Sequence, residues 1–181
     1  HDACRKICIL AALAYGQHVY PEQVATQGIR SVALEDVSYA ESKGYRIKLL
    51  GRALRQGEKV CAYVAPHLVP DSSPLAGVED VFNAIALTGN AVGDVMFYGR
   101  GAGKLPTASA VVGDIIDIAR DPKRKRHNMW GPGREDLVVS PENLAVRWYV
   151  RADAAPAGVE LLSRADAPEG EKAFLTAAMD E

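Results

Sequence analysis

The sequence lacks long apolar runs, a strong excess of either charge and any paired arrangement of cysteines. No apolar run approaches the roughly 18 residues that would span a bilayer, so we expect no membrane partner. The formal net charge is only −2 at pH 7, and the sequence pI is about 6.1. Neither value implies an overall attraction to nucleic acid or to an anionic membrane surface.

Cysteine is scarce, with three residues at positions 4, 8 and 61. An odd number without paired spacing predicts reduced thiols in a cytoplasmic protein rather than a disulfide framework. Cys4 and Cys8 share one face of a predicted helix near His1, but the other histidines lie in unrelated contexts. We therefore expect no metal site.

The amino-acid composition is typical of a soluble globular protein. Its 181 residues are 48% hydrophobic and 24% charged, enough for one domain or one domain with a small appendage. The first residues, HDACRKICIL, show neither an initiator Met nor the layout of a signal peptide. We interpret the chain as a fragment of a longer protein.

Hydrophobic periodicity predicts helices over 2–16, 33–44 and 105–120. The third has a continuous apolar stripe that we expect to face inward, made of Ala108, Val111, Val112, Ile115 and Ala119. Alternation predicts a strand over 45–56, a returning strand over 60–70, and a second pair over 81–89 and 94–99. Consecutive strands joined by short turns predict an α+β fold, with a mixed or antiparallel sheet and helices packed on one face.

Residues 121–136 change character, being basic and rich in Pro and Gly, which predicts a loop or linker. The KRKR run at 123–126 is the pattern of a nucleic-acid patch, but in a chain of net charge −2 we interpret it as a solvated loop. Beyond it, 144–153 alternates like a strand and 168–181 favours a helix. We therefore expect a small α/β appendage at the C-terminus.

The glycines of GRGAGK, residues 99–104, raise the question of a phosphate-binding loop. A P-loop would need Gly where Tyr98 stands and a hydroxyl residue where Leu105 stands. The dinucleotide fingerprint also fails, because the third glycine, Gly103, comes one residue early. Two interpretations stay open: a backbone that closes on an anion or flat polar ring at a helix N-terminus, or a tight strand-to-helix turn.

Four long segments resemble the catalytic region of homoserine dehydrogenase: HDACRKICILAALAYG, YRIKLLGRA, PLAGVEDVFNAIALTGNAVGDVMFYG and YGRGAGKLPTASAVVGDIIDIAR. This resemblance implies a catalytic domain over 1–120, a linker over 121–144 and the start of a small C-terminal domain over 145–181. It also implies NAD- or NADP-dependent oxidation of L-homoserine to L-aspartate 4-semialdehyde, a cytoplasmic step in threonine, methionine and isoleucine biosynthesis. The family's catalytic domain forms homodimers through its sheet.

The family pattern D-x-x-x-K matches Asp2 and Lys6, and the last loop glycine matches Gly103. The resemblance implies that Lys6 is the proton acid/base and that Asp2 helps to hold homoserine. It implies that Gly103 and its neighbour Gly101 approach a cofactor, NADP or NAD, that an upstream nucleotide-binding domain mainly binds. Without the resemblance, Asp2 and Lys6 would be read as an ordinary i,i+4 ion pair.

The sequence departs from the family in several places. The usual His-Pro-Thr-Leu run is Ala65-Pro66-His67-Leu68 here, and Ser73 replaces a histidine before Pro-Leu-Ala. A second catalytic lysine and a substrate-binding glutamate would lie upstream, so we expect the chain alone to be inactive. The segment 146–162 lies where the first strand of an ACT regulatory domain would be, although only 156–159 corresponds to its signature. The alternative function is a non-enzymatic small-ligand-binding or subunit-interaction module, in which 99–103 is only a turn.

Overall fold

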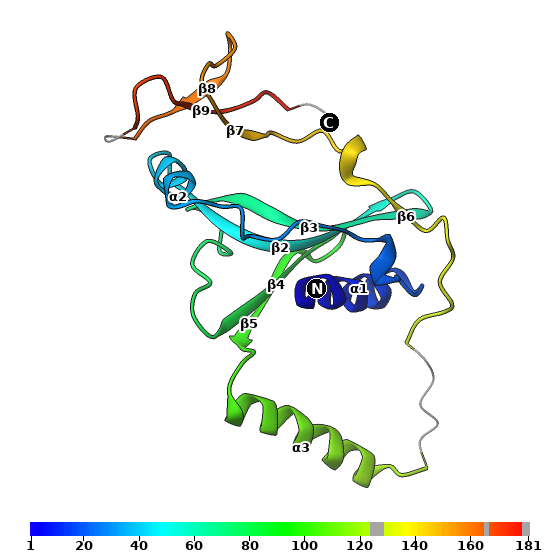
Figure 1. The fold of residues 1–181 in the computed structure, drawn as a ribbon. Coiled ribbons are helices and arrows are strands. Elements are labelled where there is room, and N and C mark those ends of the chain that lie inside the picture. The colour runs from blue at the N-terminus through cyan, green and yellow to red at the C-terminus, as the bar shows by residue number, and fades with distance from the viewer. Residues whose placement is uncertain (124–128, 165–166, 179–181) are drawn as a thin grey trace. The chain divides into compact units, whose positions relative to one another are not determined.

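The structure, a computed structural model, describes residues 1–123, 129–164 and 167–178 and divides them into two compact units (Figure 1). The first unit takes the ranges His1–Pro70 and Asn128–Glu181, and the second takes Asp71–His127. The predicted solvated loop at 123–126 lies outside the described residues, apart from Lys123.

Helix α1 spans Asp2–Tyr15 and confirms the helix predicted from the apolar spacing. It ends at Gly16, whose φ of 76° is in the left-handed region and whose N–H donates to the Ala12 carbonyl at 2.9 Å. Glycine accepts this conformation without strain, which is why it terminates helices so often. The side of α1 that faces the protein is formed by Cys4, Ile7, Cys8, Ala11 and Ala12.

A mixed sheet forms the centre of the first unit. Strands β2 (Tyr45–Gln56) and β3 (Lys59–Pro70) pair antiparallel around a turn at Gly57, which has φ 61°. The short strands β1 (Ala25–Thr26) and β6 (Val138–Val139) both pair parallel with β3. The predicted α+β class with a mixed sheet is confirmed.

Helix α1 lies along one face of the β2–β3 pair (Figure 1). Gly51 of β2 allows this close approach, because a Cβ atom there would lie 3.0 Å from the Cβ of Ile7. The two elements enclose the main core cluster, whose buried members are Cys4, Ile7, Cys8, Ala11, Val19, Val24, Val60, Ala62, Val64 and Leu137. The helix that carries Asp2 and Lys6 is thus held rigidly against the sheet.

Helix α2 spans Leu34–Glu41 and begins with a hydrogen bond from the Ala33 N–H to the Asp36 carboxylate at 2.8 Å. Three antiparallel strands lie beside it in the order β7-β9-β8, with bounds Tyr149–Ala152, Lys172–Leu175 and Glu160–Leu162. Two short 3₁₀ helices, η1 (Pro21–Gln23) and η2 (Pro141–Asn143), complete the first unit.

The helix expected over 168–181 is wrong where the structure describes it, because Lys172–Leu175 is strand β9. Its residues favour a helix by propensity, but β9 pairs with β7 on one side and β8 on the other. Burial of Ala173, Phe174 and Leu175 in this position outweighs a local preference of only a few tenths of a kcal/mol per residue. The helix that packs on this sheet is α2, from much earlier in the chain.

The second unit contains a β-hairpin and a helix. Strands β4 (Phe82–Gly89) and β5 (Gly93–Arg100) pair antiparallel, and helix α3 spans Lys104–Arg120. These elements confirm the predicted strands and helix. The predicted burial of one face of α3 is wrong for this chain, since Val111 is 53% exposed and Ile115 is 58% exposed.

Candidate functional site

Asp2 and Lys6 meet on the exposed side of α1. The Lys6 Nζ lies 2.9 Å from an Asp2 carboxylate oxygen, with the side chains 62% and 83% exposed respectively. The spacing of four residues brings them together, and the buried residues Cys4 and Ile7 hold the opposite side of the helix on the sheet. The first turn of α1 therefore presents an exposed ammonium group and an exposed carboxylate on a backbone that packs against the sheet.

Gly101 follows β5, and the position of the Asn83 side chain favours a glycine there. A Cβ atom at this position would collide with the side-chain amide of Asn83. The Gly101 N–H and the Asn83 Nδ2 both donate to the Val81 carbonyl, each at 3.3 Å. These contacts explain Gly101 as part of a tight turn, which is one of the two interpretations left open by the sequence.

Gly103 forms the start of α3 and has φ 113°, a conformation that an L side chain rarely adopts. Its carbonyl accepts the first helical hydrogen bond, from the Thr107 N–H at 3.2 Å. The first turn of α3 has no acidic residue, and Lys104 occupies its first position. The N–H groups of this turn and the positive end of the helix dipole favour an anion or a polar ring.

The neighbouring Arg100 is held over an aromatic pair. Its guanidinium carbon lies 4.9 Å from the centroid of the Phe82 ring, and Phe82 stacks on Tyr98 with ring centroids also 4.9 Å apart. The segment from Arg100 to Lys104 therefore combines two positive side chains with glycine backbone. The sequence analysis did not predict this stack of Arg100, Phe82 and Tyr98. The pairing of Phe82 with Arg100 follows from the register of the hairpin.

The four predicted site residues thus form two pairs. Asp2 and Lys6 are joined in the first unit, whereas Gly101 and Gly103 belong to one connection in the second unit.

Within the described residues, no group of three or more His, Cys, Asp or Glu side chains is arranged to hold a metal ion. The three cysteines are free and buried, and burial together with the neighbouring Cys4 raises the pKa of Cys8 to about 11.

His67 is half-buried and held in one orientation. Its Nδ1 lies 2.8 Å from the Ala65 carbonyl, which assigns the ring proton to Nδ1, and its Nε2 lies 3.3 Å from the Tyr63 hydroxyl. Burial lowers the pKa of His67, the hydrogen bond to the Ala65 carbonyl partly opposes this, and the charge of Arg52 adds to the lowering. Ser73, where the family often has a histidine, accepts a hydrogen bond from the Leu75 N–H at 3.3 Å. Both departures from the family pattern therefore have local structural roles.

A shallow concavity of about 460 Å³ lies beside the end of α1, and its lining is His18, Tyr20, Trp130 and residues 131–133. The Trp130 indole N–H donates to the His18 ring at 3.1 Å, and this contact orders the aromatic lining. None of the predicted site residues lines this concavity.

Across the described part of the chain, no helix has both the length and the apolar character needed to cross a membrane.

Comparison with known proteins identifies the family. The model of the homoserine dehydrogenase family matches residues 1–116. Curated homoserine dehydrogenases from Neisseria gonorrhoeae and Bacillus subtilis are 48% and 39% identical to the chain, over 85% and 83% of its length. The chain spans only 37% and 35% of those two proteins.

The fold gives the same result. A crystal structure of a homoserine dehydrogenase from Thiobacillus denitrificans superposes with a TM-score of 0.77 at 33% identity, covering 96% of this chain and 44% of that one. A homoserine dehydrogenase structure from S. aureus superposes with a TM-score of 0.75 at 29% identity, covering 99% of this chain and 47% of its own. The family model covers the helix with Asp2 and Lys6 and most of helix α3, and the chain belongs to the homoserine dehydrogenase family.

Proposed function

We propose that this chain is the substrate-binding and catalytic part of an NAD(P)-dependent homoserine dehydrogenase. Such an enzyme interconverts L-homoserine and L-aspartate 4-semialdehyde. The match of the family model to residues 1–116 carries the proposal, because it covers the segments that contain both residue pairs. Since the chain spans little more than a third of its curated relatives, the activity belongs to a longer protein.

Lys6 is the proposed proton acid/base. Oxidation of a primary alcohol to an aldehyde removes a proton from oxygen and a hydride from carbon, so a base must lie at the hydroxyl group. Neutral Lys6 would take the hydroxyl proton, and in the reverse reaction its ammonium group would return that proton to the carbonyl oxygen. The exposure of Lys6 on the first turn of α1 leaves its Nζ accessible to a substrate.

Asp2 is the proposed substrate-holding residue. Its carboxylate is complementary to the ammonium group of homoserine, and it lies within hydrogen-bond distance of the Lys6 Nζ. A substrate bound by Asp2 would therefore have its remaining polar groups near the proposed base. Proximity of this kind is a large part of what enzymes supply.

Gly101 and Gly103 are proposed to approach the cofactor, NADP or NAD. The N–H groups at the start of α3 and the charges of Arg100 and Lys104 fit a polar ring edge or an anionic group. The cofactor would supply the hydride acceptor. Because the loop has no dinucleotide fingerprint, most of the cofactor would be bound by a nucleotide-binding domain outside this chain.

The proposed partners are the two substrates and a second copy of the chain, with neither nucleic acid nor membrane involved. A homodimer through the sheet domain is supported by the apolar side chains that the β4–β5 hairpin leaves exposed, among them Ile85, Leu87 and Phe97. The proposed location is the cytoplasm, and the proposed pathway role is in threonine, methionine and isoleucine biosynthesis. The non-enzymatic binding module is disfavoured by the family assignment.

Replacement of Lys6 by Ala in a full-length enzyme containing this chain tests the proposal. Loss of a general acid/base should lower kcat by at least about a hundredfold. Cofactor affinity, followed by nicotinamide fluorescence, should not change. Arg5→Ala, on the same exposed turn of α1, is the matched control and should keep nearly full activity.

Retained turnover in Lys6→Ala would remove Lys6 from the mechanism. Turnover of homoserine by the chain alone would contradict the expectation that a further domain is required. Loss of cofactor binding together with activity would point to a folding defect, which circular dichroism would detect.

A further inference from the structure

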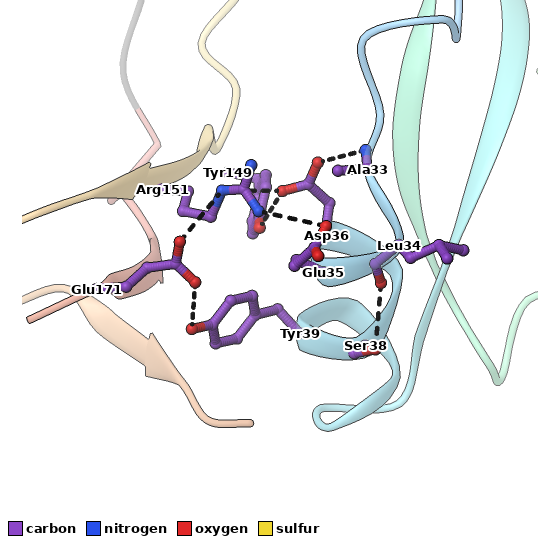
Figure 2. A network of polar contacts seen from close by, with 9 residues as sticks. All are labelled: Ala33, Leu34, Glu35, Asp36, Ser38, Tyr39, Tyr149, Arg151 and Glu171. Carbon is purple, nitrogen blue, oxygen red and sulfur yellow. Dashed lines mark hydrogen bonds and ion pairs between the residues drawn. The ribbon is translucent and has the colours of Figure 1, made fainter. Parts of the chain in front are cut away.

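Five side chains join α2 to the C-terminal sheet, and we call them the polar latch: Asp36, Tyr39, Tyr149, Arg151 and Glu171. Asp36 and Tyr39 come from α2, Tyr149 and Arg151 from β7, and Glu171 immediately precedes β9. Figure 2 shows these groups pointing toward one another across the space between the helix and the strands. The latch joins segments more than a hundred residues apart.

Asp36 is the centre of the latch. It is only 8% exposed, and its Oδ1 accepts a hydrogen bond from the Tyr149 hydroxyl at 2.8 Å. Its Oδ2 accepts the helix-capping hydrogen bond from the Ala33 N–H, also at 2.8 Å. One carboxylate therefore both starts α2 and binds β7, and a buried carboxylate that loses a partner is costly.

Arg151 lies among three carboxylates. Its Nε is 3.5 Å from Asp36 and 3.9 Å from Glu171, and its guanidinium is 4.0 Å from Glu35 (Figure 2). Glu171 also accepts a hydrogen bond from the Tyr39 hydroxyl at 3.0 Å. Alternation along β7 places Tyr149 and Arg151 on the same face of the strand, which is the face turned to α2.

The apolar part of this contact is small and separate from the main core. Its buried members are Tyr39, Leu162, Ala173 and Leu175. None of these four belongs to the buried cluster between α1 and the β2–β3 pair, although partly buried Tyr45 of β2 and Leu68 of β3 pack against them. No buried member of the main core cluster comes from the C-terminal sheet, so the two buried clusters have no residue in common.

We propose that the polar latch makes the C-terminal sheet a separately opening unit, which can detach from α2 and from the side chains of Tyr45 and Leu68 while α1 and the β2–β3 pair remain folded. A small apolar contact leaves much of the closing free energy to directional polar groups. Loss of one such group therefore shifts the equilibrium between closed and open forms.

Hydrogen exchange measured by mass spectrometry on the whole chain tests this proposal. Tyr149→Phe removes one hydroxyl and keeps the ring, and Arg151→Met removes the guanidinium and keeps a long side chain. In either variant, amides of β7 and β9 should exchange about tenfold faster, as expected for the loss of a hydrogen bond to a charged group. Amides of α1 and β3 should keep their wild-type rates.

Glu41→Gln is the matched control, because it removes an exposed ion pair between α2 and Arg46 without touching the C-terminal sheet. It should leave the exchange of β7 and β9 unchanged. Equal acceleration in β7, β9, α1 and β3 would overturn the proposal, since the unit would then open only by global unfolding. Unchanged exchange in β7 and β9 of Tyr149→Phe would overturn it as well. If Arg151→Met does not fold, the Tyr149→Phe result decides alone.

Discussion

The two compact units use the same kinds of residues in opposite ways. In the first unit, apolar side chains from α1, β3 and the C-terminal sheet are buried. In the described part of the second unit, Ala76 alone is a buried hydrophobic residue. Helix α3 has no buried residue, and its exposed large side chains are Leu105, Val111, Val112, Ile115, Ile116 and Ile118.

This difference shows that an amphipathic pattern predicts a buried face without saying what buries it. A two-stranded hairpin is marginal by itself in water, and a helix with an exposed apolar stripe is usually an interaction surface. The first unit carries its own core, whereas the second presents side chains suited to cover by another surface. The following predictions test this contrast.

The largest effect is expected in the core of the first unit. Leu137 is 1% exposed and lies in the main cluster, so Leu137→Ala should lower the free energy of unfolding by about 2–5 kcal/mol. Urea denaturation followed by circular dichroism measures this change. A loss below about 1 kcal/mol would mean that the cluster is loosely packed.

An intermediate effect is expected at the glycine loop of the second unit. Gly101→Ala places a Cβ atom against the exposed Asn83 amide, which must turn away from the Val81 carbonyl, so the loop should be destabilised by about 1 kcal/mol through the lost hydrogen bond. The same change in an Asn83→Ala background should cost much less, because that amide and its hydrogen bond are already absent. Hydrogen exchange of β4 and β5 reports the loop directly. An equal loss in both backgrounds would indicate a reason for Gly101 other than this contact.

The C-terminal sheet should loosen at alkaline pH. Burial, followed by the hydrogen bond to Asp36, raises the pKa of Tyr149 above its ordinary value of 10.0, while the charge of Arg151 opposes the rise and the nearby Tyr39 adds to it. The neutral phenol is thus favoured in the folded state. Its stabilising effect is complete below pH 10 and is lost as the pH rises through the raised pKa.

The measurement for this prediction is the stability difference between the wild type and Tyr149→Phe, followed from pH 9 upward. The difference should shrink with rising pH, because the phenylalanine variant has no phenol to ionise. Other groups with raised pKa values, such as Cys8 and Tyr15, remain in both proteins and cancel. A difference independent of pH would contradict the role assigned to the Tyr149 hydroxyl.

The smallest effect on stability is expected on α3. Ile115 is 58% exposed, so Ile115→Ser should change the free energy of unfolding of the chain by no more than about 0.5 kcal/mol. The same change should weaken concentration-dependent association, measured by analytical ultracentrifugation. A large loss of stability would show that α3 is covered within the chain and would remove the contrast between the two units.

The local spacing of apolar residues was sufficient to predict most helices and strands of the fold. The spacing of Ile7, Ala11 and their neighbours placed α1, and alternation placed the β2–β3 pair, because each pattern has one period that suits one secondary structure. The family motifs also located Asp2 and Lys6 one helical turn apart, and the structure joins them. Their catalytic and substrate-binding roles remain predictions.

The sequence by itself determined the family, the α+β class and the surface on which Asp2 and Lys6 stand, since these depend on motifs and on contacts near in the chain. Tertiary structure alone decided that Lys172–Leu175 is a strand, that α3 keeps its apolar face exposed, and that Asp36 binds Tyr149. Each of these depends on partners far away in sequence, or on their absence among the described residues. No local preference carries that information, because the free energy of burial and pairing depends on which surfaces meet.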